Sequence, residues 1–170
     1  MLPALPSRRV VNLAGFVACA GMMGFALYAQ YGLLLDPCPL CILQRVAVIS
    51  LGLVFLVAAL HDPAGGARKV YGVLLGVIAV CGTAVAGWHV RMQHLPPDEL
   101  PSCGPGLDYM LDNFPLGEML KMVFTGSGEC GDVLWRFLGL SMPTWVLIGV
   151  GTLGIVGVWN GFSRRAVAPW

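Results

Sequence analysis

Two cysteines separated by two residues, Cys38 and Cys41, stand at the start of the second of four long apolar stretches. A disulfide between them would enclose only two residues, and a bridge across so short a loop stabilises the folded chain little. The pair is therefore better explained by redox chemistry than by stapling. Only the thiolate form of cysteine is nucleophilic, and the exposed N–H groups and dipole of a helix N-terminus stabilise a thiolate. We therefore predict that both cysteines are catalytic.

Arg45 follows Cys41 by four residues, which places the two side chains on one face of a helix. A charge within an apolar span costs about 2.5–3.5 kcal/mol at the bilayer centre and less near the interface. One explanation is that the guanidinium stabilises a Cys41 thiolate. The other is that the long side chain simply reaches the outer membrane surface. The spacing from a redox cysteine favours the functional interpretation.

Two more cysteines, Cys103 and Cys130, fall in the long segment before the last apolar stretch. Four cysteines allow three pairings, and proximity in the sequence favours Cys38–Cys41 together with Cys103–Cys130. The second bridge would close a loop of roughly 30 residues and stabilise the protein by roughly 3–4 kcal/mol. It could therefore serve as a staple, unlike the Cys38–Cys41 bridge.

Other uses of a Cys-x-x-Cys pair fit this sequence less well. Haem attachment requires a histidine directly after the second cysteine, and Ile42 stands there instead. A zinc ribbon needs a second close pair, whereas Cys103 and Cys130 are far apart in the sequence. A thioredoxin motif belongs to a βαβ unit, which apolar helices cannot provide. We expect no metal site.

The elements that position these residues are predicted to be membrane helices. Of 170 residues, 57% are hydrophobic and 11% are charged, whereas soluble domains carry about 25% charge. Four apolar stretches approach the ~20 residues needed to cross a bilayer; they run approximately over 10–31, 42–60, 70–88 and 144–162. We predict an all-α integral membrane protein, an antiparallel four-helix bundle forming a single domain. The net charge of +1 indicates no nucleic-acid-binding surface.

The first apolar stretch could be mistaken for an export signal, because Ser7-Arg8-Arg9 precedes it. The apolar region of such a signal has about 7–15 residues, whereas this stretch has 22 and lacks a clear cleavage site. We expect it to be retained as a membrane helix. Cys19 and Cys81 lie inside the first and third stretches, where we expect thiols to act as small apolar residues.

Charged residues divide unevenly between the two sides of this arrangement. The side that holds the N-terminus, residues 61–69 and the C-terminus carries six basic residues and one acidic residue. The side that holds residues 32–41 and 89–143 carries four basic and eight acidic residues. Because basic loops stay in the cytoplasm, we expect both termini and the 61–69 loop to be cytoplasmic. The other two loops are expected to face outward.

The outward loop 89–143 contains one stretch with helical periodicity. Apolar residues recur at helical spacing between residues 116 and 124, with Glu118 and Lys121 beside them. This pattern predicts a short amphipathic helix on the outer membrane surface. The alternative is that the same stretch packs against the end of the bundle.

Taken together, these features resemble the bacterial DsbB family of membrane disulfide-generating oxidoreductases. The matching segments are Pro37–Arg45 (Pro-Cys-Pro-Leu-Cys-Ile-Leu-Gln-Arg), Ser127–Cys130 and Trp135–Trp145. The number of spans, the order of the loops and the placement of the cysteines agree as well, so the resemblance covers nearly the whole chain. Gln44 stands where the family often has an acidic residue, and residues 95–113 share only their cysteine with the family.

The resemblance implies a path for electrons. A reduced DsbA-like dithiol carrier of thioredoxin fold, in the periplasm, would attack the Cys103–Cys130 disulfide at Cys103. Cys130 would then pass the electrons to Cys38. Cys41 would face a membrane quinone, either ubiquinone or menaquinone, which takes up two electrons. The protein would thus be a quinone-dependent protein disulfide oxidoreductase of a bacterial inner membrane, and its activity would sustain disulfide formation in exported proteins.

The resemblance also implies roles for two residues near the cysteines. Arg45 would bind and polarise the quinone, and His89 would be a second contact or a proton donor. The alternative for His89 is a histidine at the membrane interface beside Trp88. A structural disulfide has a reduction potential below about −300 mV, whereas such carriers work near −180 mV. Oxidation of the carrier by such a disulfide alone would therefore be unfavourable by roughly 5 kcal/mol. An external oxidant is needed to drive it.

Two alternatives to this function come from other classes of protein. One is a non-catalytic four-span scaffold with a disulfide-stapled outer loop. The other is a membrane protein that binds a metal through its four outward thiols. A scaffold held together by an outer disulfide would need neither the Cys-x-x-Cys pair nor Arg45 beside it.

Overall fold

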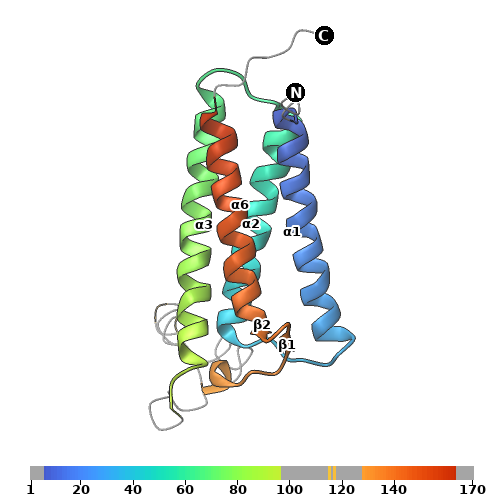
Figure 1. Cartoon of the computed structure of the whole chain (residues 1–170), viewed down its shortest axis with the longest axis vertical. Helices are drawn as coiled ribbons and strands as arrows, with labels where there is room; N and C mark the ends of the chain where they lie inside the picture. The colour runs from blue at the N-terminus through green and yellow to red at the C-terminus, as the bar shows by residue number, and fades with distance from the viewer. Residues whose placement is uncertain (1–5, 97–114, 116, 118–127, 164–170) are drawn as a thin grey trace.

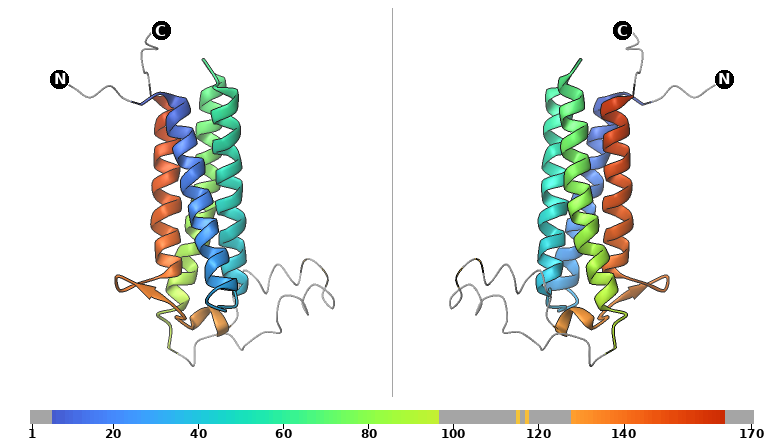
Figure 2. Two further views of the ribbon diagram at one scale, coloured as in Figure 1. Left: turned by 90° about the vertical axis from the view of Figure 1, so that its right-hand side faces the viewer. Right: turned by 90° about the vertical axis from the view of Figure 1, so that its left-hand side faces the viewer.

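The fold is a bundle of four long helices, seen in a computed structural model that describes residues 6–96, 115, 117 and 128–163 (Figures 1 and 2). The helices are α1 (Arg8–Tyr31), α2 (Pro39–His61), α3 (Ala67–Met92) and α6 (Met142–Phe162). Each of them is long and apolar enough to cross a membrane. The predicted all-α four-span bundle is confirmed. The predicted amphipathic helix at 116–124 and Cys103 lie outside the described residues.

The helix that carries the cysteine pair begins earlier than its apolar stretch. Cys38 is the N-cap of α2, with an extended backbone at φ −68° and ψ 164°. Pro39 follows in the first turn, where its fixed φ suits a helix and its missing N–H costs nothing. The far end is closed by Asp62 in the left-handed conformation, at φ 42°. The first turn of α2 therefore holds both cysteines.

Contacts between the helices are uneven around the bundle. The most extensive contacts join α3 to α6, α1 to α2 and α2 to α3, whereas α1 and α6 touch little. The core between them is built from large apolar side chains, with Leu51, Phe55 and Val150 fully buried. Cys19 belongs to this core, and Cys81 is exposed on the outside of the bundle.

Close approach of α3 and α6 depends on small residues. A Cβ added at Gly154 would lie 2.2 Å from the Cβ of Ala79, and one added at Gly161 would lie 2.9 Å from the carbonyl oxygen of Arg68. Neither position has space for a side chain. Small residues at such crossings let the backbones of membrane helices approach closely. The resulting van der Waals packing favours helix association in lipid, where no hydrophobic effect acts between helices.

The two ends of the bundle differ in chemistry. At one end, Arg8 and Arg68 both donate hydrogen bonds to the carbonyl oxygen of Ser163, at 2.7 and 3.3 Å. Nearby, the buried Asn160 side chain donates to Asn12 across the α1–α6 contact at 2.8 Å. The cysteine pair lies at the opposite end (Figure 1).

A short hairpin joins the cysteine end to α6. Its strands are β1 (Arg136–Phe137) and β2 (Leu140–Ser141), which pair antiparallel. The two turn residues, Leu138 and Gly139, both have positive φ, 51° and 78°, as a two-residue hairpin turn requires. The Trp145 indole donates to the Phe137 carbonyl at 3.1 Å. Aromatic residues at this level are typical of a membrane interface.

Candidate redox site

The first turn of α2 brings the two sulfurs of the Cys-x-x-Cys pair together. Their Sγ atoms lie 3.0 Å apart, and the Cys38 thiol donates toward Cys41. As the N-cap side chain, Cys38 Sγ also accepts a hydrogen bond from the Cys41 backbone N–H at 3.4 Å. The unpaired N–H groups at this helix end favour negative charge on a nearby sulfur. The local fold is thus compatible with a thiolate at the pair.

A third cysteine and a histidine complete the cluster. Cys130 comes from the short 3-10 helix Gly128–Gly131, and His89 from the last turn of α3. The ligand atoms of Cys38, His89 and Cys130 all lie within 4.8 Å of one another, and all three side chains are buried. Residues far apart in the sequence therefore meet at one point, with Cys38 next to both Cys41 and Cys130. We call these four residues the redox cluster.

The proton on Cys38 is held tightly. Hydrogen bonds with the side chains of Cys130 and Cys41, and then burial, raise the pKa of the Cys38 thiol above its ordinary value. Only one of two sulfurs 3.0 Å apart can carry a full negative charge, because like charges so close repel. Cys38 is accordingly the proton donor of the pair.

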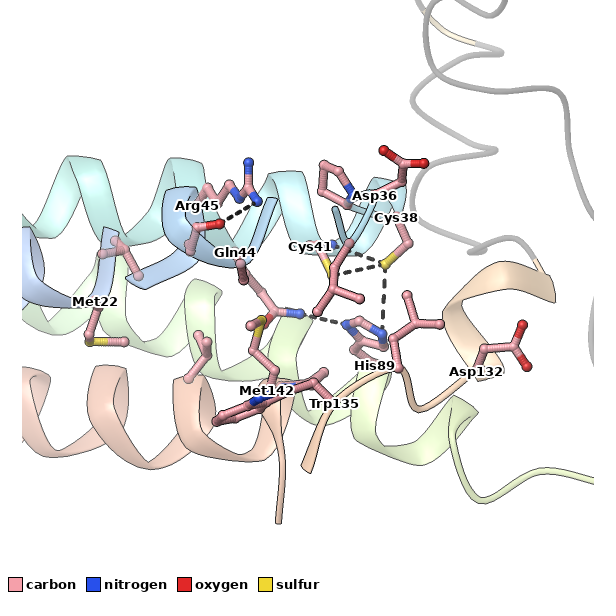
Figure 3. A pocket seen from close by; sticks show the side chains of 18 of the residues that line it. Met22, Asp36, Cys38, Cys41, Gln44, Arg45, His89, Asp132, Trp135 and Met142 are labelled. Atoms are coloured by element: carbon pink, nitrogen blue, oxygen red, sulfur yellow. Dashed lines mark hydrogen bonds between the residues drawn. The ribbon is translucent and has the colours of Figure 1, made fainter. Parts of the chain in front are cut away.

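His89 is held in place from both sides (Figure 3). Its Nε2 lies 3.7 Å from Cys38 Sγ, and its Nδ1 lies 2.8 Å from the Gln44 amide nitrogen. Both Gln44 and His89 are buried, with 4% and 2% of their surface exposed. In the tautomer in which Nδ1 accepts from the amide, Nε2 carries the ring proton and points it at Cys38. His89 also hydrogen-bonds the Cys130 backbone.

Arg45 turns toward α1 rather than toward the membrane surface. Its guanidinium donates to the side-chain oxygen of Gln30 and, at 3.2 Å, to the carbonyl oxygen of Ala26. The side chain is half-buried. Arginine has five N–H donors, so these two contacts leave others for a ligand. Simple extension to the outer surface does not describe this side chain.

A cavity of about 380 Å³ lies between the redox cluster and the interior of the bundle. This volume is within the range of small-molecule sites, roughly 300–1,000 Å³. Its polar wall includes Cys38, Cys41, Gln44, Arg45 and His89, with Asp36, Gln93 and Asp132 also lining it. The apolar wall comes from α1, α2, α6 and the segment before the hairpin, and it includes Met22, Met23, Val48, Leu134, Trp135, Met142 and Val146. Because α1 and α6 touch little, we call this space the α1–α6 cavity.

The structure collects most of the residues singled out in the sequence. Cys38, Cys41, Cys130 and His89 form the redox cluster, and Arg45 lines the adjoining cavity. The catalytic and quinone-binding roles given to them stay predictions.

Two glutamines have parts in this site that sequence reasoning did not assign. Gln30 binds Arg45, and Gln44 binds His89. Each is a polar residue within an otherwise apolar helix. Because a polar group inside a membrane span is costly, such a residue usually has a functional role. That signal could have identified them.

Comparison with known proteins agrees with this arrangement. The sequence model of the family described as disulfide bond formation protein DsbB matches residues 8–160. The chain belongs to the DsbB family.

Curated DsbB relatives match along almost their whole length. The Disulfide bond formation protein B of Methylococcus capsulatus is 50% identical over 159 residues, which cover 92% of this chain and 97% of the relative. That of Nitrosococcus oceani is 52% identical over 154 residues, 91% of each chain. That of Hahella chejuensis is 48% identical over 158 residues, 93% of this chain and 94% of the relative. Membership of the DsbB family makes the chain a multi-pass membrane oxidoreductase of disulfide bond formation.

Proposed function

We propose that this protein reoxidises a DsbA-like periplasmic dithiol carrier and passes the electrons to a membrane quinone. The observation that carries the proposal is the position of Cys38, 3.0 Å from Cys41 on one side and within 4.8 Å of Cys130 on the other. A disulfide relay needs one sulfur that can pair with either neighbour in turn. Cys38 has that position.

The first step would take place at the outer cysteines. The thiolate of the reduced carrier attacks Cys103 of the Cys103–Cys130 disulfide, so a mixed disulfide forms at Cys103 and Cys130 leaves as a thiolate. Thiol–disulfide exchange proceeds by just such an attack of a thiolate on a disulfide sulfur. The second carrier thiol then displaces Cys103, which releases oxidised carrier. This step leaves two electrons on the Cys103–Cys130 pair.

The second step would move those electrons inward. The Cys130 thiolate attacks Cys38 of the Cys38–Cys41 disulfide, a Cys38–Cys130 bond forms, and Cys41 leaves as a thiolate. The Cys103 thiolate then attacks Cys130, which restores the outer disulfide and releases Cys38. Lower pKa makes a thiol a better leaving group. The N-terminus of α2 and the nearby charge of Arg45 supply that stabilisation for Cys41.

His89 would stabilise the charge on Cys38 in this exchange. Its Nε2–H points at Cys38 and its other nitrogen is held by Gln44, so it can donate a hydrogen bond to the Cys38 thiolate when that sulfur is released from Cys130. A hydrogen bond to a charged group contributes about 1.5–3 kcal/mol. Gln44 acts through His89 and is a positioning residue.

The α1–α6 cavity has the chemistry that a quinone head group requires. Its apolar wall suits a flat ring, and the polar wall holds Arg45 together with Cys38, Cys41 and His89 of the redox cluster. A bound quinone would supply an acceptor for two electrons and two protons. Arg45 would hold a ring oxygen by hydrogen bonding, and Cys41 would present its thiolate to the ring. The weak contact between α1 and α6 leaves room for an isoprenoid tail to reach the lipid.

We also place the protein in a bacterial inner membrane, with the redox cluster at the periplasmic face. The end opposite the cluster bears Arg8 and Arg68, and basic residues are retained in the cytoplasm. With four spans, both termini then lie on the cytoplasmic side.

Quinone reduction by a reduced carrier tests the proposal. Purified protein, reduced carrier of thioredoxin fold and a soluble quinone analogue are mixed, and quinone absorbance is followed. We expect turnover with the native chain and none with Cys41→Ala. Cys81→Ala, a matched loss of one thiol on the outside of the bundle, should turn over normally. Absence of turnover in the native chain, or undiminished turnover in Cys41→Ala, would refute the proposal.

A further inference from the structure

The redox cluster contains the donor atoms of a metal site. Two buried cysteines and one buried histidine, Cys38, Cys130 and His89, have ligand atoms within 4.8 Å of one another. Cys41 adds a fourth donor, with its Sγ 3.0 Å from that of Cys38. Thiolate and imidazole are the ligands that Zn²⁺ prefers in four-coordinate protein sites. The spacing argument against a metal, drawn from the sequence, did not allow for Cys130 folding back onto Cys38.

The distances are close to those of a tetrahedral site. With bonds of about 2.3 Å to sulfur and about 2.0 Å to nitrogen, a tetrahedral ion separates sulfur from nitrogen by about 3.6 Å and two sulfurs by about 3.8 Å. Cys38 Sγ and His89 Nε2 lie 3.7 Å apart. The Cys38–Cys41 distance of 3.0 Å is shorter and would open by less than an ångström through side-chain rotation.

The surroundings of His89 also suit a ligand. A metal-binding histidine usually donates its second ring N–H to a fixed acceptor, which sets the tautomer and the ring orientation. Gln44 lies 2.8 Å from Nδ1. If its amide rotates by half a turn, the oxygen accepts from Nδ1–H and Nε2 is left with a lone pair. An amide can do this because its two ends have nearly the same shape.

We propose that the fully reduced protein binds one soft divalent ion of the Zn²⁺ type through Cys38, Cys130 and His89, with Cys41 as the fourth ligand. Three thiols and the ion give three metal thiolates and release three protons. The sulfurs are neither oxidised nor reduced. When Cys38 and Cys41 form a disulfide, those two thiolates are lost and the site disappears. The metal-bound form cannot undergo disulfide exchange, so metal binding would hold the protein in its reduced, inactive state.

The inference rests on the proposed function only for the source of fully reduced protein, which forms when a second reduced carrier opens the Cys103–Cys130 disulfide before Cys38 and Cys41 have been reoxidised. Metal binding itself needs neither carrier nor quinone. Failure of quinone reduction by metal-free protein would therefore count against the proposed function, whereas failure to bind metal would count against this inference alone.

Cobalt titration provides the test. The full chain in detergent is reduced with a phosphine under anaerobic conditions, freed of reductant and titrated with Co²⁺. We expect thiolate-to-cobalt absorption in the near ultraviolet and tetrahedral bands in the visible, saturating at one ion per chain and displaced by Zn²⁺. Oxidised protein should show none of these bands.

Variants assign the ligands. Cys130→Ser and His89→Ala should each lose or shift the cobalt bands, whereas Cys19→Ser and Cys81→Ser should leave them unchanged, since these thiols lie away from the cluster. Gln44→Leu should weaken cobalt affinity by roughly 10- to 100-fold, the usual effect of losing such a supporting contact.

X-ray absorption on the zinc-loaded native chain keeps the test independent of variant folding, and it should give three sulfur ligands and one nitrogen ligand. Equal cobalt binding by oxidised protein, a zinc shell of oxygen and nitrogen only, or no effect of Cys130→Ser would overturn the inference.

Discussion

At the scale of single residues, Cys38 is the centre of the site. It caps α2, lies 3.0 Å from Cys41 and 3.7 Å from His89, and is hydrogen-bonded to Cys130. Its neighbour Cys41 lies beside the α1–α6 cavity and one helical turn from Arg45. Both line the cavity, but Cys38 also contacts Cys130 and His89, whereas Cys41 lies on the helix face that leads to Arg45. That difference is the basis for assigning them different roles.

Replacement of Arg45 should affect quinone use far more than disulfide exchange. Loss of a hydrogen bond to a charged group costs about 1.5–3 kcal/mol, so Arg45→Gln should raise the KM for quinone by roughly 10- to 100-fold. The rate of exchange between reduced carrier and the Cys103–Cys130 disulfide, measured without quinone, should change little. Equal loss in both half-reactions would show that Arg45 is structural, with its contacts to Gln30 and Ala26 holding α1 in place.

Replacement of Gln44 should slow the inner exchange. Gln44→Leu leaves His89 Nδ1 buried without its partner, which costs about 1–3 kcal/mol and frees the ring to turn. The transfer of electrons from Cys130 to Cys38 should slow by roughly 10-fold, as followed by rapid acid quenching and thiol labelling. Gln44→Glu, whose carboxylate accepts from Nδ1–H and so draws the ring proton away from Nε2, should be no faster than Gln44→Leu. A normal rate in the Leu variant, or a rate restored in the Glu variant, would show that His89 does not depend on this donor.

Spacing along one helix made part of this site predictable. Cys38, Cys41 and Arg45 share the first two turns of α2, so positions i, i+3 and i+7 on one face were enough to relate them. The contacts of Cys130 with Cys38 and of Gln44 with His89 depend on how separate elements pack together. No local pattern carries that information, and Gln44 was noticed only as a departure from the family.

At the scale of the helices, contacts around the bundle differ in closeness. α3 and α6 approach through Gly154 and Gly161, while α1 and α6 touch little and have the α1–α6 cavity between them. The close packing of α3 against α6 fixes His89 relative to the start of α6. The weak contact between α1 and α6 leaves space for a ligand. The segment before the hairpin adds Trp135, which lines the cavity and stacks on Phe137 at a centroid distance of 5.9 Å.

A methyl group at Gly154 should destabilise the bundle. Its Cβ would meet that of Ala79 at 2.2 Å, so Gly154→Ala forces α3 and α6 apart and should lower the free energy of unfolding by about 1–3 kcal/mol, the usual cost of overpacking. Gly21→Ala is the matched control, because a Cβ there has nothing within 4 Å. Both changes gain similar helix propensity. Thermal unfolding in detergent should show a lower Tm for Gly154→Ala only; equal Tm values would contradict the close packing.

Filling the α1–α6 cavity should block quinone without stopping exchange. Ala26 lines the cavity from α1, and Ala26→Phe would occupy much of the space for a ring while keeping the carbonyl that binds Arg45. We expect at least a 10-fold rise in the KM for quinone, with normal carrier oxidation by the Cys103–Cys130 disulfide. Ala18→Phe, on the exposed face of the same helix, controls for the added bulk. An unchanged KM in Ala26→Phe would place the quinone elsewhere.

Helix positions could be predicted because length and apolarity alone define a membrane span. The start of α2 at Pro39, ahead of its apolar stretch, depends on the cap formed by Cys38. The hairpin was not predicted, since strands of two residues have no periodicity to detect. The loose α1–α6 contact also has no pattern in the sequence. It follows from which helix faces meet.

At the scale of the whole molecule, the bundle has a basic end and a redox end. Arg8, Arg68 and the Asn12–Asn160 pair lie at the basic end, and the redox cluster and α1–α6 cavity lie at the other (Figures 1 and 3). The charge asymmetry of the sequence predicted this polarity because it depends only on loop composition. Under the proposed function, the cavity within the bundle and the cysteines at its end would let electrons pass from a water-soluble carrier to a lipid-soluble one.

The most direct test of the account is whether Cys38 can pair with Cys130. In Cys41→Ser, the Cys38 thiolate has lost its own partner and should attack Cys130, which forms a Cys38–Cys130 disulfide and releases Cys103. Peptide mapping by mass spectrometry under non-reducing conditions should find Cys38–Cys130 as the main linked peptide, and Cys38→Ser should give little Cys41–Cys130. Recovery of Cys103–Cys130 intact with Cys38 as a free thiol, or pairing of Cys130 with Cys41 rather than Cys38, would contradict the account.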